Sequence, residues 1–431
     1  MKLLSMCKKA TKTNEFPHWK SKKIVIILTS LAILEMISLN IVFPQLAYYV
    51  TIRSTGNISI RQVVAKSGSP QDVQAAVNSI AAMGGGTVYV PEGEWTFNPP
   101  QQQWGCAVSV PGGVSVIGAG IGKTILKQTT ASTLTTYFFA LDGSNGKPIR
   151  ISGFTFEVVS VEDDYGVVGI TVDRTLDFRI DHISFINFSG MAIYTEDSRG
   201  VIDHCNIDNP YKDNYLPHNP NGEYFAVWGY GIVITAPNMP WQSSISYYLG
   251  QYKDYIVYIE DCNFSRCRHA VASNNEAWYV VRYCSFEKAS AYGQVDVHGG
   301  SPGGRGHEVY NCVFDLSDES YSLGQDAATE PRGGGGIVWN NTVIINTNYP
   351  TKTVDMGSDG QSYPYDVRQY YIWGNTAYDH NQNPINFTDR IDPWNYQENV
   401  NYFLRAPNQQ QDGFTYTPYP YPHPITQSVS P

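Results

Sequence analysis

A short phrase recurs seven times between residues 179 and 377, and this repeat limits the possible folds more than any other feature of the chain. Its copies are RIDHISF, VIDHCNI, YIEDCNF, VVRYCSF, EVYNCVF, IVWNNTV and YIWGNTA, ending at Phe185, Ile207, Phe264, Phe286, Phe314, Val343 and Ala377. Successive copies lie 22, 57, 22, 28, 29 and 34 residues apart. About 22 residues make one coil of a parallel β-helix, so the longer intervals indicate coils with insertions.

The repeat also predicts which side chains stack inside the coils. A coil cannot bury its inward side chains alone, so it stacks on the next at about 4.8 Å and places like residues in columns. We expect the cysteines of one column to be structural, with stacking as reduced core side chains favoured over disulfides. That column contains Ile183, Cys205, Cys262, Cys284, Cys312, Asn341 and Asn375.

An amphipathic helix is predicted just before the coils. A Ser-Pro pair opens it and three glycines close it, and a strand, TVYV, follows directly. Such a helix would cover the open end of the hydrophobic core, which otherwise exposes unpaired strand edges. Its apolar face consists of Val73, Ala76, Val77, Ile80 and Ala81.

The N-terminus predicts a membrane anchor. Residues 1–23 hold seven lysines and one glutamate, and residues 24–43 form an apolar run, interrupted by Glu35, that is long enough to cross a bilayer. The basic flank places everything after residue 45 outside the cell. We expect an uncleaved transmembrane signal anchor on the extracellular side, with a cleaved signal and secretion as the alternative. A linker at 44–61, one β-helix domain at 62–423 and a tail at 424–431 would follow.

The exported part is strongly acidic. The chain has 29 Lys and Arg against 39 Asp and Glu, and without residues 1–23 the balance is 22 against 38, a net charge of −16. This charge argues against a nucleic-acid partner. A polyanionic ligand would therefore need local arginines or a bound cation.

The stretch VIGAGIGKTIL superficially looks like a phosphate-binding loop. Gly118 and Gly122 enclose three residues where that loop has four. The following ILKQTTASTLTTYFF is β-branched and reads as strand, whereas phosphate binding needs a helix N-terminus there. We therefore expect no nucleotide partner.

Together, QAAVNSIAAMGGGTVYVPEGEW, VSVIGAGIGKTIL and the repeated phrase resemble the right-handed parallel β-helix proteins of the pectate-lyase-like superfamily. The resemblance covers roughly residues 62–423. It implies an all-β, right-handed parallel β-helix with an N-terminal capping helix, in which the glycine-rich phrase is a turn between early coils. It also implies extracellular polysaccharide chemistry by lyases and glycoside hydrolases, although the superfamily includes non-catalytic adhesins and spike proteins.

The resemblance does not assign catalytic residues. RIDHISF is similar to a WIDH phrase of pectate lyases, but Arg179 stands in place of the tryptophan, and the Asp-His pair recurs one coil later at Asp203 and His204. A repeated pair indicates a ladder of coil turns, so no catalytic role is carried over. The polygalacturonase pattern of paired aspartates, Gly-His-Gly and Arg-Ile-Lys is absent from this sequence.

The candidate site comes from three successive coils between the copies that end at Phe264 and Val343. In QVDVHGG, the inward valines 295 and 297 direct Asp296 and His298 outward, about 7 Å apart. The neighbouring coils add further polar residues, and glycine-rich loops leave room for a ligand. The predicted catalytic residues are His298, Asp296, Arg332 and His269. The predicted substrate-binding residues are Asn274, Arg305, Glu330 and Trp278.

Each of these residues has a plainer explanation. An outward histidine is usually a solvated surface residue, Glu330 and Arg332 suit a simple ion pair, and Trp278 suits core packing at least as well as sugar stacking. No cofactor is certain. Glu162, Asp163 and Asp164 form a possible Ca²⁺ site, for which a solvated acidic turn is the favoured alternative.

Three functions remain open at this stage, all with a polysaccharide or surface glycan as partner. A lyase for uronate-containing glycans needs a base near the sugar C5 proton and a cation for the carboxylate, which His298 or His269 with Arg332 would supply. A glycoside hydrolase needs two carboxylates, for which Asp296 and Glu330 are the obvious pair. The third function is a non-catalytic adhesin or envelope protein tethered to the membrane.

Overall fold

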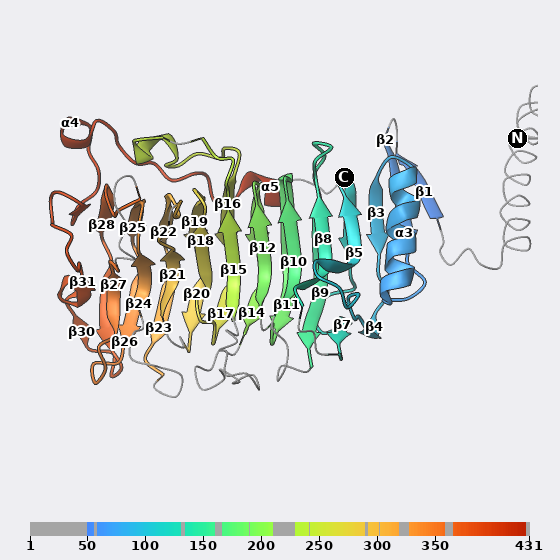
Figure 1. The fold of residues 1–431 in the computed structure, drawn as a ribbon, viewed down its shortest axis with the longest axis horizontal. Helices are drawn as coiled ribbons and strands as arrows, with labels where there is room; N and C mark the ends of the chain where they lie inside the picture. The colour runs from blue at the N-terminus through green and yellow to red at the C-terminus, as the bar shows by residue number, and fades with distance from the viewer. Residues whose placement is uncertain are drawn as a thin grey trace, which may run out of the picture. The chain divides into compact units, whose positions relative to one another are not determined.

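Three short strands make up each coil, and equivalent strands of successive coils lie side by side in the computed structural model (Figure 1). Nearly all of their pairings are parallel and in register, as between β16 (Ile256–Glu260) and β19 (Trp278–Arg282). The parallel β-helix predicted from the repeat is confirmed.

The structure describes residues 50–55, 58–130, 134–159, 166–188, 190–209, 229–240, 242–288, 292–300, 302–318, 327–357 and 365–427. The predicted basic tail at 1–23, the predicted anchor at 24–43 and the acidic turn Glu162 to Asp164 lie outside these residues. Within the described ranges, every helix is too short or too polar to span a bilayer.

The strands form three faces. The first face is a sheet of its own, and it consists of β5 (Gly105–Pro111), β8 (Thr136–Asp142), β10 (Val167–Asp173), β12 (Met191–Glu196), β15 (Tyr230–Thr235), β18 (Val271–Asn274), β21 (Gly293–Val297), β24 (Ala327–Pro331), β27 (Lys352–Asp355) and β31 (Ile391–Asp392). The second face consists of β2 (Ile58–Val64), β3 (Gly86–Tyr89), β6 (Val114–Ile117), β9 (Arg150–Val158), β11 (Leu176–Ile186), β13 (Arg199–Asp203), β16, β19, β22 (Gly306–Tyr310), β25 (Gly335–Trp339), β28 (Tyr370–Trp373) and β32 (Tyr402–Phe403).

The third face is continuous with the second, because β9 and β11 are long enough to belong to both. Its other strands are β4 (Gly93–Thr96), β7 (Thr124–Gln128), β14 (Asn206–Asp208), β17 (Asn263–Ser265), β20 (Ser285–Glu287), β23 (Val313–Leu316), β26 (Thr342–Ile345), β29 (Thr376–Asp379) and β30 (Pro384–Ile385).

Each repeated phrase is the corner between the second and third faces. One residue of the phrase turns the chain in the left-handed region, and the next residue points inward. The turning residues are His182, His204, Asp261, Tyr283, Asn311, Asn340 and Gly374, with φ between 53° and 63°. The inward residues are the predicted column, and its four cysteines are buried and unbridged, which confirms the structural prediction.

The column changes from thiols to amides without losing its hydrogen bonds. The Cys262 and Cys284 thiols each donate to the carbonyl oxygen two residues earlier, at 3.3 Å. The Asn341 side-chain oxygen accepts from the Cys312 N–H at 3.0 Å, and Asn375 does the same for the Asn341 N–H at 2.9 Å. The two asparagines thereby attach their coils to the preceding ones inside the core.

We expect Cys284→Ala to lower the free energy of unfolding by about 1 kcal/mol, because it removes a buried sulfur from a packed column. Chemical denaturation measures this loss, and any glycan binding should be unaffected. Rapid labelling of Cys284 by a bulky thiol reagent in the native protein would contradict its inward position.

The predicted capping helix is present as α3 (Pro70–Ala82), and it packs against β2, β3, β5 and β6. Ser69 caps it by accepting a hydrogen bond from the Asp72 N–H at 3.3 Å, and Pro70 occupies the first helical turn. The helix therefore covers the first coil as expected.

Two predicted boundaries need correction. The linker at 44–61 contains β1 (Val50–Thr55), which pairs antiparallel with β2, and β2 pairs with β3, so regular structure begins before residue 62. The tail at 424–431 begins with α5 (Pro424–Gln427), which contacts β11.

The glycine-rich phrase is the turn between β6 and β7, where the Thr124 hydroxyl accepts from the Ala119 N–H at 2.8 Å.

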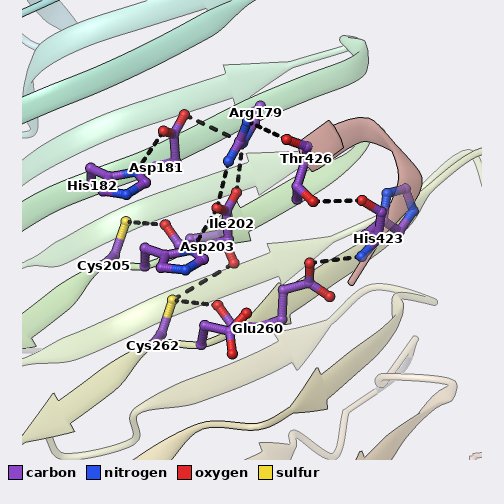
Figure 2. Close-up of polar contacts among 12 residues, drawn as sticks. Arg179, Asp181, His182, Ile202, Asp203, Cys205, Glu260, Cys262, His423 and Thr426 are labelled. Atoms are coloured by element: carbon purple, nitrogen blue, oxygen red, sulfur yellow. Dashed lines mark hydrogen bonds and ion pairs between the residues drawn. The ribbon is translucent and has the colours of Figure 1, made fainter. Parts of the chain in front are cut away.

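The chain continues through η2 (Phe387–Arg390) and α4 (Gln409–Asp412) into the C-terminal segment, defined as residues 414–427. This segment runs back along the second face (Figure 1). Arg282 donates to the carbonyl oxygens of Tyr419 and Pro420 at 2.7 and 2.9 Å. Glu260 accepts from the His423 N–H at 3.0 Å, and Arg179 donates to the Thr426 carbonyl (Figure 2). Buried charges of β11, β16 and β19 thus hold this segment in place.

Candidate functional site

Four of the predicted residues, Asp296, His298, Glu330 and Arg332, meet on the outer side of the first face, where β18, β21 and β24 pair in register. Asp296 lies between Ala272 and Glu330 on the neighbouring strands. Further along the strands, the His298 N–H donates to the Ser273 carbonyl oxygen and the Arg332 N–H donates to the Val297 carbonyl oxygen. Because Val295 and Val297 point into the core and are fully buried, Asp296 and His298 have the opposite direction, as the alternation predicts.

Arg332 and Asp296 form a two-pronged ion pair at the centre of the site. Arg332 Nε donates to Asp296 Oδ1 at 2.9 Å and Nη2 donates to Oδ2 at 2.8 Å. Burial is the largest influence and raises the pKa of Asp296, but the opposing effects, led by the charge of Arg332, together hold the pKa of this carboxyl below its usual range. Asp296 is therefore a buried anion whose role is to position the guanidinium.

His298 is the accessible member of the group, with 41% of its side chain exposed. Its Nδ1 lies 3.9 Å from Asp296 Oδ2 and accepts a hydrogen bond from Arg332 Nη2. An arginine can only donate, so Nδ1 is the lone-pair nitrogen of a neutral His298 ring. The basic nitrogen and the guanidinium are thus direct neighbours.

The pKa of Glu330 is shifted in the opposite direction from that of Asp296, although the two residues lie side by side. Its Oε2 accepts from the Gly293 N–H at 2.9 Å, and its Oε1 lies 3.9 Å from Arg332 Nε. Burial, together with the negative charge of Asp296, raises the pKa of Glu330 to about 8. One carboxyl of the pair is therefore ionised at neutral pH while the other keeps its proton, a division typical of acid and base roles.

His269 lies beneath the surface of the site. Its ring stacks between Tyr230 and Tyr292, with centroid distances of 5.3 and 5.5 Å. Nδ1 lies 2.6 Å from the Gly293 carbonyl oxygen, which can only accept, so Nδ1 carries the proton. Burial lowers the pKa of His269 to about 4, so the ring is neutral. It supports Gly293 and Glu330 and does not reach the surface, which corrects its predicted role as a substrate-contacting base.

Two predicted ligand contacts are also corrected. Trp278 is fully buried in the second face and stacks on Tyr248 at 5.0 Å. Arg305 is buried as well, and it donates to the Gln242 carbonyl at 2.8 Å. Asn274 remains beside His298, although its side-chain oxygen accepts from the Asn275 N–H at 2.8 Å.

The row of polar residues extends one coil further than the sequence suggested. Asp355 occupies the strand position next to Glu330, and Lys352 binds Asp355 and Asp392 at 2.7 and 2.9 Å. Trp394, exposed at the end of this row, donates its indole N–H to Asp355 at 3.0 Å. The sequence signal that could have indicated Asp355 is the 25-residue step from Glu330, which is about the length of one coil.

The site could be mistaken for a metal centre. His269, Asp296 and Glu330 each offer a ligand atom within 4.8 Å of the others. However, both oxygens of Asp296 are bonded to Arg332, Glu330 is protonated at neutral pH, and His269 Nδ1 carries a proton. These atoms therefore do not suit a divalent cation.

The site lies on the outer side of the first face, and His298 is its most exposed member. A hollow of about 550 Å³ lies elsewhere, on the third face, along β14, β17 and β20. Its walls include Asp208, Arg266 and Glu287, and Arg266 forms an ion pair with Asp208.

Comparison with known proteins gives short sequence matches. No protein-family model matches the chain. Mannuronan C5-epimerase AlgE3 of Azotobacter vinelandii is 31% identical over 106 residues, which are 24% of this chain and 5% of the relative. Alginate lyase 7 of the same organism is 29% identical over 94 residues, which are 21% of this chain and 11% of the relative. The matches thus span a small part of these curated relatives.

Two solved structures align with most of this chain at low sequence identity. The tailspike protein of E. coli bacteriophage HK620 in complex with pentasaccharide aligns over 72% of this chain and 53% of its own, with a TM-score of 0.46 and 15% identity. An alginate lyase from Paenibacillus sp. str. FPU-7 aligns over 74% of this chain and 95% of its own, with a TM-score of 0.46 and 13% identity.

Proposed function

We propose that this protein is an enzyme that removes the C5 proton of a uronate residue in an acidic polysaccharide. The observation that carries the proposal is the grouping of exposed His298 with the Arg332 cation and the protonated Glu330. The C5 proton becomes acidic only when the charge of the adjacent carboxylate is neutralised. A guanidinium and a neutral carboxylic acid are both suited to that task.

The positions of these groups suit the first chemical step. The C5 proton is one carbon away from the substrate carboxylate, so the base must lie beside the groups that bind the carboxylate. His298 Nδ1 lies directly beside Arg332. When the substrate carboxylate takes over the hydrogen bond from Arg332 Nη2, the lone pair of His298 Nδ1 becomes free to accept the C5 proton. The electron pair left at C5 would delocalise into the carboxylate held by Arg332 and Glu330.

Two outcomes share this step. In a lyase, the electron pair forms a C4–C5 double bond, the glycosidic oxygen at C4 leaves with a proton taken from water, and His298 returns the C5 proton to solvent. In an epimerase, C5 takes a proton from water on the opposite face, His298 returns its proton to solvent, and no bond to oxygen breaks. We propose the lyase as the main activity. Epimerisation is the second candidate because mannuronan C5-epimerases are among the curated relatives.

Hydrolysis fits these residues less well. It requires two carboxyl groups that reach the sugar, one as acid and one as base or nucleophile. Asp296 is buried, and both of its oxygens accept hydrogen bonds from Arg332. It is thus poorly placed to attack a sugar carbon or to activate water.

The proposed substrate also agrees with the predicted location. The apolar segment 24–43 and its basic flank would place the β-helix outside the cell, tethered to the membrane or secreted, where acidic polysaccharides occur. Mannuronan and alginate are the first substrates to test, since the relatives are named for them.

A panel of mannuronan, alginate, pectate and neutral glycans tests the proposal. The ultraviolet absorbance of the C4–C5 double bond reports elimination, reducing ends report hydrolysis, and proton NMR of the polymer reports epimerisation. We expect the double bond or the epimer with a polyuronate. Reducing ends without a double bond would favour hydrolysis, and binding without turnover would favour the adhesin.

We expect activity to fall as pH rises through about 8, where Glu330 loses its proton. Glu330→Gln keeps a hydrogen-bond donor but cannot ionise, so this alkaline loss of activity should disappear.

The pH dependence of stability gives a second measurement. Because the pKa of Glu330 is raised from 4.5, its contribution is complete below that value and is lost as pH rises through 8. As pH rises from 4.5 to about 8, the free energy of unfolding of wild type, measured by chemical denaturation, should fall relative to that of Glu330→Gln. Parallel plots of this free energy against pH for the two proteins would contradict the raised pKa of Glu330.

A further inference from the structure

The corner between the second and third faces carries two histidines on successive coils. His182 follows β11 and His204 follows β13, and each turns the chain with φ of 53°. Their rings are stacked in parallel, with centroids 4.9 Å apart and 4° between the planes. About half of each side chain is exposed. This pair lies outside the site described above and has no role in the proposed reaction.

A buried carboxylate orients each ring. His182 Nδ1 lies 2.8 Å from Asp181 Oδ2 (Figure 2), and His204 Nδ1 lies 2.9 Å from Asp203 Oδ2. An ionised carboxylate can only accept, so Nδ1 carries the proton in both rings. The ring lone pair is therefore on Nε2 in both residues, and neither Nε2 has a hydrogen-bond partner within the described ranges.

The carboxylates are themselves fixed by arginines. Arg150 binds both oxygens of Asp181 at 2.7 and 2.8 Å, and Arg179 binds both oxygens of Asp203 at 2.9 and 2.8 Å. The four charges balance, so the histidine pair lies in a neutral surrounding. The next coil adds Asp261 at the same turn position, which makes this corner acidic and favourable to a cation.

From this geometry we propose that His182 and His204 bind a divalent transition-metal ion, such as Zn²⁺ or Cu²⁺, through their two Nε2 atoms. Imidazoles oriented by carboxylates at Nδ1 are the arrangement that such ions use in proteins. Metal–nitrogen bonds of about 2.0–2.1 Å place two ligand nitrogens no more than about 4.2 Å apart. In the tetrahedral geometry that Zn²⁺ prefers, the two nitrogens lie about 3.4 Å apart. The parallel rings, whose centroids are 4.9 Å apart, must therefore turn until both Nε2 lone pairs converge on one ion, a rotation open to half-exposed side chains. Water would complete the shell.

Calorimetric titration of the full chain with Zn²⁺ tests the site. The variants are His182→Asn and His204→Asn, because asparagine tolerates the left-handed turn but lacks the imidazole. We expect one ion to bind wild type, and each variant to bind it at least about tenfold more weakly. His380→Asn, which removes an exposed histidine beyond β29, is the matched control and should bind as wild type does.

Equal affinity in wild type and both variants would overturn the proposal, as would an equal loss in His380→Asn. Ca²⁺, which prefers oxygen ligands, should not compete, and competition by Ca²⁺ would point to the carboxylates instead. Electron paramagnetic resonance of the Cu²⁺-loaded wild type needs no variant. Hyperfine coupling to two imidazole nitrogens is expected, and a spectrum without nitrogen coupling would overturn the site.

Discussion

His298→Ala is expected to lower turnover of the acidic polysaccharide by about a hundredfold or more, without changing thermal unfolding. The large loss follows from removal of the exposed base beside Arg332. The unchanged stability follows from the position of the ring, which is 41% exposed and outside the core. Initial rates on the best substrate of the panel, with thermal unfolding as the folding check, measure both effects.

Two further variants make this result specific. His380→Ala removes another exposed histidine and should retain wild-type turnover. Arg332→Lys keeps the positive charge but cannot bind both oxygens of Asp296, so it should lose much of the activity. Full activity in both His298→Ala and Arg332→Lys would place the chemistry elsewhere on the molecule.

Arg282→Ala is expected to lower the free energy of unfolding by about 3–5 kcal/mol, the effect of leaving one partner of a buried ion pair alone. Arg282 and Glu260 are both fully buried, with Nη2 and Oε2 2.7 Å apart. Burial already raises the pKa of Glu260, and loss of Arg282 removes the cation that opposes this shift. The C-terminal segment also loses the donor to Tyr419 and Pro420 and should be cleaved earlier by proteases.

Chemical denaturation compares this variant with Arg266→Ala, which breaks the partly exposed pair between Arg266 and Asp208. That control should cost about 1 kcal/mol or less. Similar losses in the two variants would mean that the Arg282 and Glu260 pair does not hold the second face and the C-terminal segment together. Equal protease sensitivity would argue against the attachment of that segment.

The repeated phrase was sufficient to predict the solenoid because the physics of each coil is the same. Every copy contains an inward residue such as Cys205 or Asn341 and a turning residue before it, so one copy defines the others. Strand alternation then gave the directions of Asp296 and His298, and coil spacing brought Glu330 and Arg332 beside them.

Burial by distant segments could not be predicted in the same way. Trp278 and Arg305 appeared accessible because spacing says nothing about residues 242–255, which fold over the second face and bring Tyr248 and Gln242 into contact with them. The burial of His269 has a related cause, since the rings of Tyr230 and Tyr292 cover it. The protonation of Glu330 likewise depends on burial beside an ionised Asp296, which no sequence pattern records.

Loss of label from an oligouronate that carries deuterium at C5 tests the central claim most directly. Elimination and epimerisation both begin with removal of this hydrogen, so both release it to water, whereas hydrolysis retains it. We predict release of the label by wild type, with a rate that falls by about a hundredfold or more in His298→Ala. Turnover with the label fully retained at C5 would contradict proton abstraction by His298 beside Arg332 and Glu330.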